Sequence, residues 1–137
     1  MYKRVIVTID MAKLQRGEEQ LRRAAALVDD GGSIVVVNVV EAVPSYVVVD
    51  LPADFALDAI RDAEEKLAAL CRRLQIAATV DVRTGQPAAA ILAAAADHAA
   101  DLIIVGSHIP DVSTYFLGAV ADRLVRHASC SVLVDRR

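Results

Sequence analysis

Small and polar residues that could bind an anion follow two apolar runs of the chain. Asp10 ends the first run, and Gly106 and Ser107 end a later one. Gly118 and Ala119 stand at the start of a helical pattern. Because small residues let backbone N–H groups and a helix N-terminus approach a phosphate closely, these positions predict an anion-binding site. A plain strand-to-loop turn and close packing of a helix on a sheet would need the same small residues.

The ionisable side chains leave more than one interpretation open. Asp10 either binds a ligand at a sheet edge or caps the first helix. His108 would donate to a phosphate or ribose oxygen, or be solvated. His98 is expected to face solvent or to end a helix, and His127 to lie at a helix C-terminus. The sequence has no Ser-His-Asp spacing, no HExxH and no GxxxxGK[ST] motif, so nothing in it requires an enzyme.

Alternating strand and helix patterns must position these residues. Continuous aliphatic runs predict strands buried on both faces, at 5–9, 33–40, 77–83, 102–105 and 130–134. Helical periodicity predicts helices at 18–30, 53–74 and 88–100, and a last helix entered through Ser113 and Thr114. Gly31-Gly32 should end the first helix, Pro87 should open the third, and 41–52 should be a loop. Residues 1–137 are expected to form one α/β domain with a doubly wound, five-stranded parallel sheet.

Composition excludes several classes of function. A net charge of −3 and a pI near 5.5 argue against duplex nucleic acid as a partner, because phosphate neutralisation needs a basic surface. The N-terminus lacks the pattern of a signal peptide, and no apolar run reaches bilayer-spanning length. Cys71 and Cys130 are far apart without a CxxC motif, which indicates reduced core thiols in a cytoplasmic protein.

Short strings along the whole chain resemble the universal stress protein family. They are the first strand ending in Asp10, Asn38-Val39-Val40, Thr84-Gly85-Gln86-Pro87, residues 101–107, and Arg126-His127-Ala128 before the last strand. The string SHIPDVSTYFLG is similar to a nucleotide-binding subgroup with SHxPDxxTYLLGS. The chain lacks the second glycine of the family's usual G-x2-G-x9-G-[ST] motif. It has Ile109 where the subgroup often has arginine, and Ala119 where a hydroxyl is usual.

This resemblance implies a Rossmann-like, adenine nucleotide α-hydrolase-like fold with strand order 3-2-1-4-5. It implies ATP, ADP or AMP as the ligand, with Mg²⁺ beside a triphosphate. The implied binding residues are Thr8, Asp10 and Val39 at the adenine and ribose, Val105, Gly106, Ser107 and His108 along the ribose and phosphates, and Gly118, Ala119 and Val120 at the phosphate end.

The resemblance also implies a homodimer paired through strand 130–134, which Asp135 should shorten. The function that follows is a cytoplasmic stress-response sensor or regulator that hydrolyses ATP slowly at most. Two alternatives stay open. One is a nucleotide-free protein-interaction module of the same fold. The other is an enzyme of the wider nucleotide-hydrolase group, against which the missing second glycine counts.

Overall fold

Five parallel strands form one sheet with the order β3-β2-β1-β4-β5. The computed structural model describes residues 1–41, 55–107 and 118–136. The strands are β1 (Tyr2–Thr8), β2 (Val28–Val40), β3 (Thr79–Thr84), β4 (Leu102–Gly106) and β5 (Ser131–Asp135). The helical elements are η1 (Met11–Lys13), α1 (Leu14–Leu27), α3 (Phe55–Leu74), α4 (Pro87–Asp97) and α5 (Ala119–His127). The predicted fold class and strand order are confirmed.

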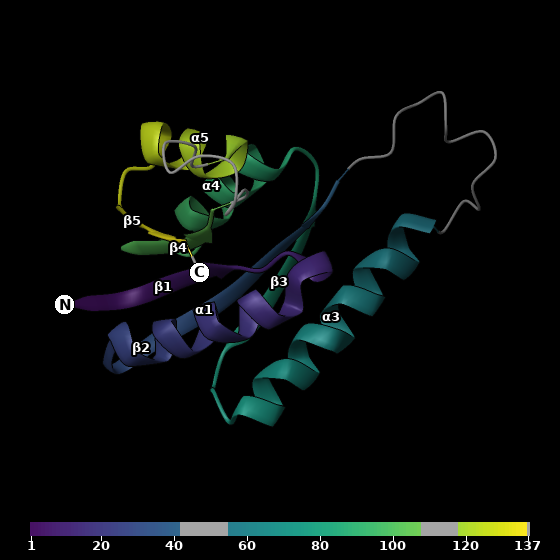
Figure 1. Ribbon diagram of the computed structural model, residues 1–137, viewed down its shortest axis with the longest axis horizontal. Coiled ribbons are helices and arrows are strands. Elements are labelled where there is room, and N and C mark those ends of the chain that lie inside the picture. Colours follow the sequence, from purple (N-terminus) through teal and green to yellow (C-terminus); the bar gives the residue numbers. More distant parts are fainter. Residues whose placement is uncertain (42–54, 108–117, 137) are drawn as a thin grey trace.

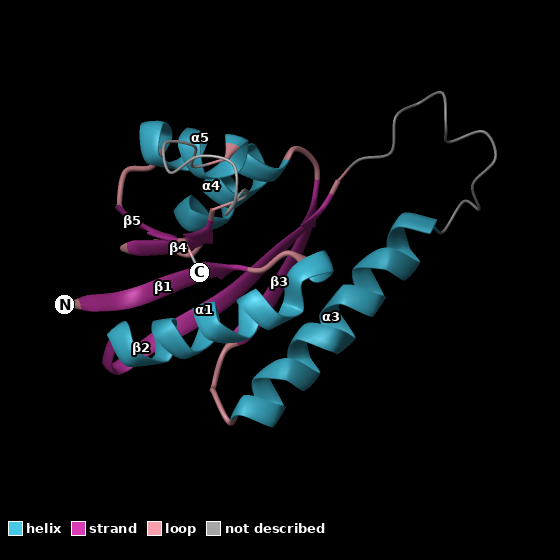
Figure 2. Ribbon diagram, in the orientation of Figure 1, coloured by secondary structure: helices cyan, strands magenta, loops and turns pink. Residues whose placement is uncertain are grey.

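The helices cover the two faces of the sheet in pairs, α1 with α3 and α4 with α5 (Figures 1 and 2). Val5 and Val7 of β1 pack into the core beneath α1 and α3, whereas Ile6 packs into the core beneath α4 and α5. All three are almost fully buried. Burial on both faces explains why the strand sequences are continuous aliphatic runs without alternation.

The first helix ends earlier than the sequence predicts. The prediction extended it over 18–30, but α1 ends at Leu27 and β2 begins at Val28. The Val28 N–H bonds the carbonyl of Ala24, while its own backbone is extended, with ψ 139°. Val28 then pairs with Tyr2, and a β-branched residue such as valine favours a strand over a helix.

Gly31-Gly32 lies inside β2 and does not stop a helix. The pairing of β1 with β2 shifts register between Tyr2 and Arg4. Gly31 has φ +79°, and a Cβ on Gly32 would lie 2.8 Å from the carbonyl oxygen of Lys3. The two glycines therefore allow a bulge where the strands come too close for a side chain.

Other boundaries differ from the prediction by up to four residues: β1 begins at Tyr2 and not at residue 5, α1 at Leu14 and not at residue 18, and α4 ends at Asp97 and not at residue 100. α4 begins at Pro87, as predicted, and the Gln86 side chain caps it by accepting from the Ala89 N–H at 2.8 Å. β5 runs from Ser131 and includes Asp135, which pairs with Gly106. The predicted loop at 41–52 lies outside the described residues except for Glu41, as does the entry to the last helix at Ser113 and Thr114.

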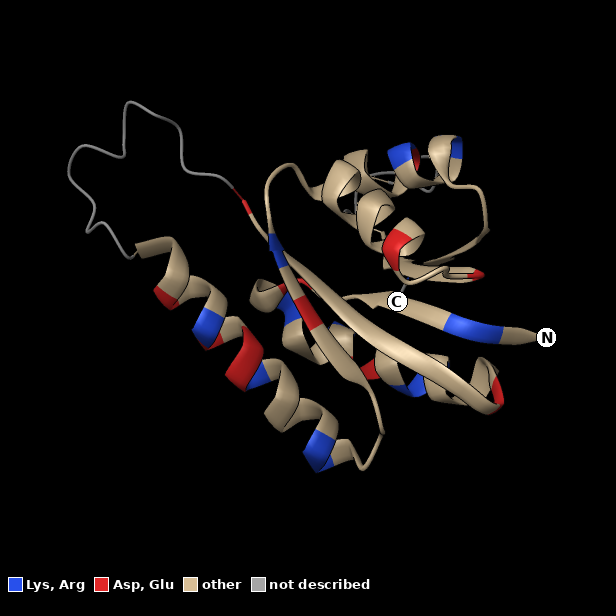
Figure 3. Cartoon of the chain, turned by 180° about the vertical axis from the view of Figure 1, so that it is seen from behind, with Lys and Arg blue, Asp and Glu red and all other residues tan. Residues whose placement is uncertain are grey.

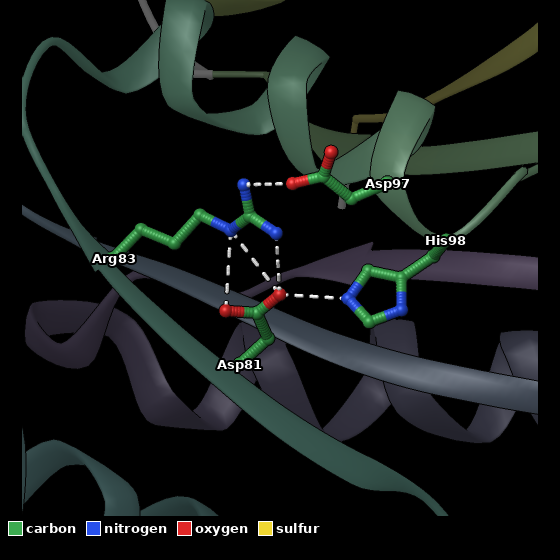
Figure 4. A network of polar contacts seen from close by, with 4 residues as sticks. All are labelled: Asp81, Arg83, Asp97 and His98. Carbon is green, nitrogen blue, oxygen red and sulfur yellow. Dashed lines mark hydrogen bonds and ion pairs between the residues drawn. The ribbon is translucent and has the colours of Figure 1, made fainter.

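An ionic network fastens the end of α4 to edge strand β3 (Figure 4). Arg83 donates from Nε and Nη2 to Asp81, and its Nη1 lies 2.9 Å from Oδ2 of Asp97. Nε2 of His98 lies 2.7 Å from Oδ2 of Asp81. Hydrogen bonds from Arg83 hold the pKa of Asp81 below its usual value. His98 is thus a helix-end residue, one of its two predicted placements.

Charged residues of both signs lie along α3 (Figure 3). Asp58 stands in its first turn and Arg72 and Arg73 in its last turn, the order that suits the helix dipole. Within the ranges that the structure describes, no helix is both long and apolar enough to cross a membrane.

Candidate functional site

A cavity of about 310 Å³ lies at the carboxyl ends of the central strands. β1 is followed by α1 on one face of the sheet, and neighbouring β4 leads on to α5 on the other face (Figure 1). The strand order therefore reverses between β1 and β4, and α/β sheets bind ligands at this kind of switch point. The volume lies at the lower end of the range of small-molecule pockets.

Most of the residues singled out in the sequence surround this one cavity. Those on its wall are Thr8, Asp10, Val39, Val105, Gly106, Ser107, Ala119 and Val120. Gly118 directly precedes the last two but does not itself line the cavity. His108 lies outside the described residues.

Asp10 both caps a helical turn and lies on the cavity wall. Its Oδ1 accepts from the Ala12 N–H at 2.9 Å and so caps η1. Its residue is exposed, and Oδ2 takes part in no hydrogen bond or ion pair with the described residues. The capping interpretation is thus confirmed, and the second oxygen remains available to a donor on a ligand.

The α5 N-terminus forms a further part of the wall. Gly118 is its N-cap, with φ +92° and ψ 155°, a conformation that is essentially restricted to glycine. Among the described residues, no side chain caps the helix, and the first amides of a helix have no partner within it. Ala119 and Val120 therefore bring N–H groups without a described partner, and the positive end of a helix dipole, to the cavity wall.

Gln20 of α1 is a cavity residue that the sequence did not single out. The β1–β4 ladder ends at Val7 and Ile104, so Gly106 N–H and Thr8 C=O would be its next donor and acceptor. With its amide oriented as its partners require, Gln20 accepts from Gly106 N–H at 2.7 Å and donates to Thr8 C=O at 3.2 Å. Gln20 is 4% exposed, and its side-chain amide lies between the ends of β1 and β4 and bonds both.

Arg16, one turn before Gln20, also lines the cavity. Its Nη1 donates to the carbonyl of Ser107 at 2.7 Å, and its Nη2 donates to the carbonyl of Asp135 at 3.3 Å. It thus covers the carboxyl ends of β4 and β5 from the α1 side. One feature of the sequence could have indicated that this part of α1 contributes to the site. Gln20 is a polar residue beside Leu21 in the apolar stripe of an amphipathic helix.

Asn38 interrupts the aliphatic run of β2 and lies on the cavity wall. Its Nδ2 donates to the carbonyl of Ile9 at 2.8 Å, and the residue is 6% exposed. Among the described residues, none donates to its Oδ1. A buried acceptor of this kind is expected to find a donor, in the protein, in water or in a ligand.

The layers, strand order and switch-point cavity define an open, doubly wound α/β protein of the kind that binds small ligands at its strand ends. Residues 1–136 match the model of the Universal stress protein family, and the chain belongs to that family. Universal stress protein G of Shigella flexneri is 30% identical over 142 residues, covering 99% of this chain and 100% of that protein.

Solved structures share the fold. A universal stress protein in complex with cAMP superimposes with a TM-score of 0.70 at 17% identity, covering 98% of this chain and 97% of that one. A universal stress protein from Archaeoglobus fulgidus in complex with dAMP gives a TM-score of 0.63 at 15% identity, covering 98% of both chains.

Proposed function

We propose that this chain binds an adenine nucleotide in the cavity between β1, β4 and the start of α5 and acts as a stress-response sensor or regulator. The observation that carries the proposal is the convergence on one cavity of an Asp10 carboxylate oxygen and a helix N-terminus at Ala119, neither of which has a partner among the described residues. A nucleotide needs a hydrogen-bond acceptor for its sugar hydroxyls and donors for its phosphates. Related folds in complex with cAMP and dAMP support adenine nucleotides as the class.

The roles follow from where the residues lie. Asp10 accepts from the ribose hydroxyls, the apolar side chain of Val39 contacts the adenine ring, and Val105 lines the path of the ribose and phosphates. The Ser107 hydroxyl and the amides of Ala119 and Val120 take the phosphates, because the N–H groups of Gly106 and Ser107 already donate to Gln20 and to the Asp135 carbonyl. Ala119 offers no hydroxyl, so ADP and AMP are candidates beside ATP, with Mg²⁺ accompanying a triphosphate. We assign binding to this site and at most slow hydrolysis.

Replacing Asp10 with asparagine tests the proposal. Asp10→Asn keeps the oxygen that caps η1 but replaces the free carboxylate oxygen with an amide group. Loss of a charged hydrogen bond of about 1.5–3 kcal/mol should weaken AMP and ATP binding roughly tenfold or more. Isothermal titration calorimetry with and without Mg²⁺ measures this, and mass spectrometry of the denatured protein detects co-purified nucleotide.

Asp30→Asn is the matched control, since Asp30 is an exposed carboxylate near the start of β2 and makes no contribution to the cavity. It should bind nucleotide as the unmodified chain does. Absence of saturable binding to the unmodified chain at millimolar nucleotide would refute the proposal and leave the nucleotide-free interaction module.

We further propose that the chain forms a homodimer through β5. β5 is an edge of the sheet, with Val132, Leu133 and Val134 half-buried, and an apolar edge strand is normally paired or covered. Asp135 belongs to the strand and should limit the length of the pairing. Sedimentation equilibrium should give twice the chain mass, and a mass equal to one chain at micromolar concentration would contradict the dimer.

We assign the protein to the cytoplasm. Cys71 and Cys130 are both free thiols, and burial raises the pKa of each. Cys71 is buried and Cys130 is half-buried, and protonated thiols with little exposure are unreactive and suit a reducing compartment.

A further inference from the structure

Arg16 lies on the cavity wall and forms no ion pair with a carboxylate among the described residues. Its two hydrogen bonds, to the carbonyls of Ser107 and Asp135, are made with neutral groups. Elsewhere on the same helix Arg22 pairs with Glu18 and Arg23 lies 3.4 Å from the Asp135 carboxylate. Arg16 thus differs from its neighbours in that its charge remains available to an anion.

The position of the guanidinium group is fixed on the phosphate side of the cavity. A Cβ on Gly106 would lie 3.6 Å from Nη2 of Arg16, so the group lies against the turn that follows β4. Arg16 is only partly exposed, and its two carbonyl acceptors hold it in one orientation. A guanidinium group has five N–H donors, which leaves donors free for a second set of acceptors.

Among the described residues, the cavity wall has two cations, Lys13 and Arg16. Ile109 stands where the resembled subgroup often has arginine, and Ala119 stands where it has a hydroxyl. A partly buried guanidinium group suits phosphate better than an ammonium group does, because its planar fork donates two parallel hydrogen bonds. Arg16 is therefore placed to supply the charge that the loop sequence lacks.

We infer that Arg16 is the residue that selects for the phosphate groups of the bound nucleotide. This inference rests on the proposed nucleotide site. Arg16 adds affinity for AMP, ADP and ATP and none for adenosine, which has no phosphate. Its contribution falls with rising salt, because the interaction is electrostatic.

Calorimetric titration of adenosine, AMP, ADP and ATP into the full chain and into Arg16→Gln tests this. We expect Arg16→Gln to weaken binding of the three phosphates roughly tenfold or more, as for a lost charged hydrogen bond, and to leave adenosine unchanged. Arg16→Lys keeps the positive charge but lacks the planar pair of N–H donors. Its affinity for AMP, ADP and ATP should lie between that of the unmodified chain and that of Arg16→Gln. Arg22→Gln, with the same charge change on an exposed residue of α1, should bind all four as before.

The outcomes separate this inference from the proposed function. If the unmodified chain binds none of the four compounds, both fail. If the unmodified chain binds them and Arg16→Gln lowers the affinity for adenosine by the same factor as the affinity for ATP, Arg16 only covers the strand ends. In that case this inference fails and the proposed function stands. Unchanged ATP binding by Arg16→Gln overturns it too. Thermal unfolding by circular dichroism verifies that each variant is folded.

Discussion

Replacing Gly17 with valine should lower the free energy of unfolding by about 3 kcal/mol, the upper part of the usual range for overpacking a core. Gly17 is buried where α1 crosses the end of β1. A Cβ at this position would lie 2.5 Å from Cγ2 of Ile9, a branch next to the backbone of a side chain that is only 2% exposed. The low helix propensity of glycine would favour replacement by about 1 kcal/mol at most, so the steric term dominates.

A compensating change distinguishes this clash from other effects of valine. Ile9→Ala removes as many side-chain carbons as Gly17→Val adds, and alone should cost about 2–5 kcal/mol through the cavity it leaves. The double variant should be more stable than the two single effects predict, by about 1–3 kcal/mol. Urea denaturation of the four proteins completes the cycle.

Gln15→Val is the control for helix propensity, because Gln15 is an exposed residue of the same helix. It should change stability by well under 1 kcal/mol. Additive effects of Gly17→Val and Ile9→Ala, within about 0.5 kcal/mol, would show that the two positions do not interact. Because Ile9 also lines the cavity, Gly17→Val should weaken nucleotide binding as well.

The sequence was enough to predict the layers, because their signals are local, whereas the strand order was an expectation from the family resemblance. Val5, Ile6 and Val7 form a run that only a strand covered on both faces can bury, and the helix α3 shows its period and its charge order directly. Asp10 and Gly106 were located for the same reason, since each simply follows such a run.

The remainder of the site depends on contacts between distant parts of the chain. Arg16 and Ser107 are 91 residues apart in sequence, and no local pattern identifies the carbonyl that Arg16 contacts. Gly31-Gly32 was misassigned because glycines that end a helix and glycines that allow a bulge look alike in sequence. Only the pairing with β1, which places Lys3 against Gly32, separates the two.

Replacing Gln20 with methionine should lower the free energy of unfolding by about 2–4 kcal/mol. Methionine nearly matches glutamine in size but can satisfy neither Gly106 N–H nor Thr8 C=O, and each buried polar group left without a partner costs about 1–3 kcal/mol. The exposed Gln15→Met on the same helix is the control and should have almost no effect. Urea denaturation measures both.

A second readout follows from the position of Gln20 between the strand ends. Its amide occupies the place where Gly106 N–H and Thr8 C=O would otherwise meet, so it keeps β1 and β4 apart where the cavity opens. In Gln20→Met the strand ends either approach each other, which narrows the cavity, or leave both groups unsatisfied. Amide hydrogen exchange at Gly106 distinguishes these results, since direct pairing preserves protection and an unpaired amide exchanges faster.

Nucleotide affinity should fall in both cases, because the turn at Gly106 loses the hydrogen bond from its N–H to Gln20. A variant with unchanged stability, exchange and affinity would show that the strand ends are separated by something other than Gln20.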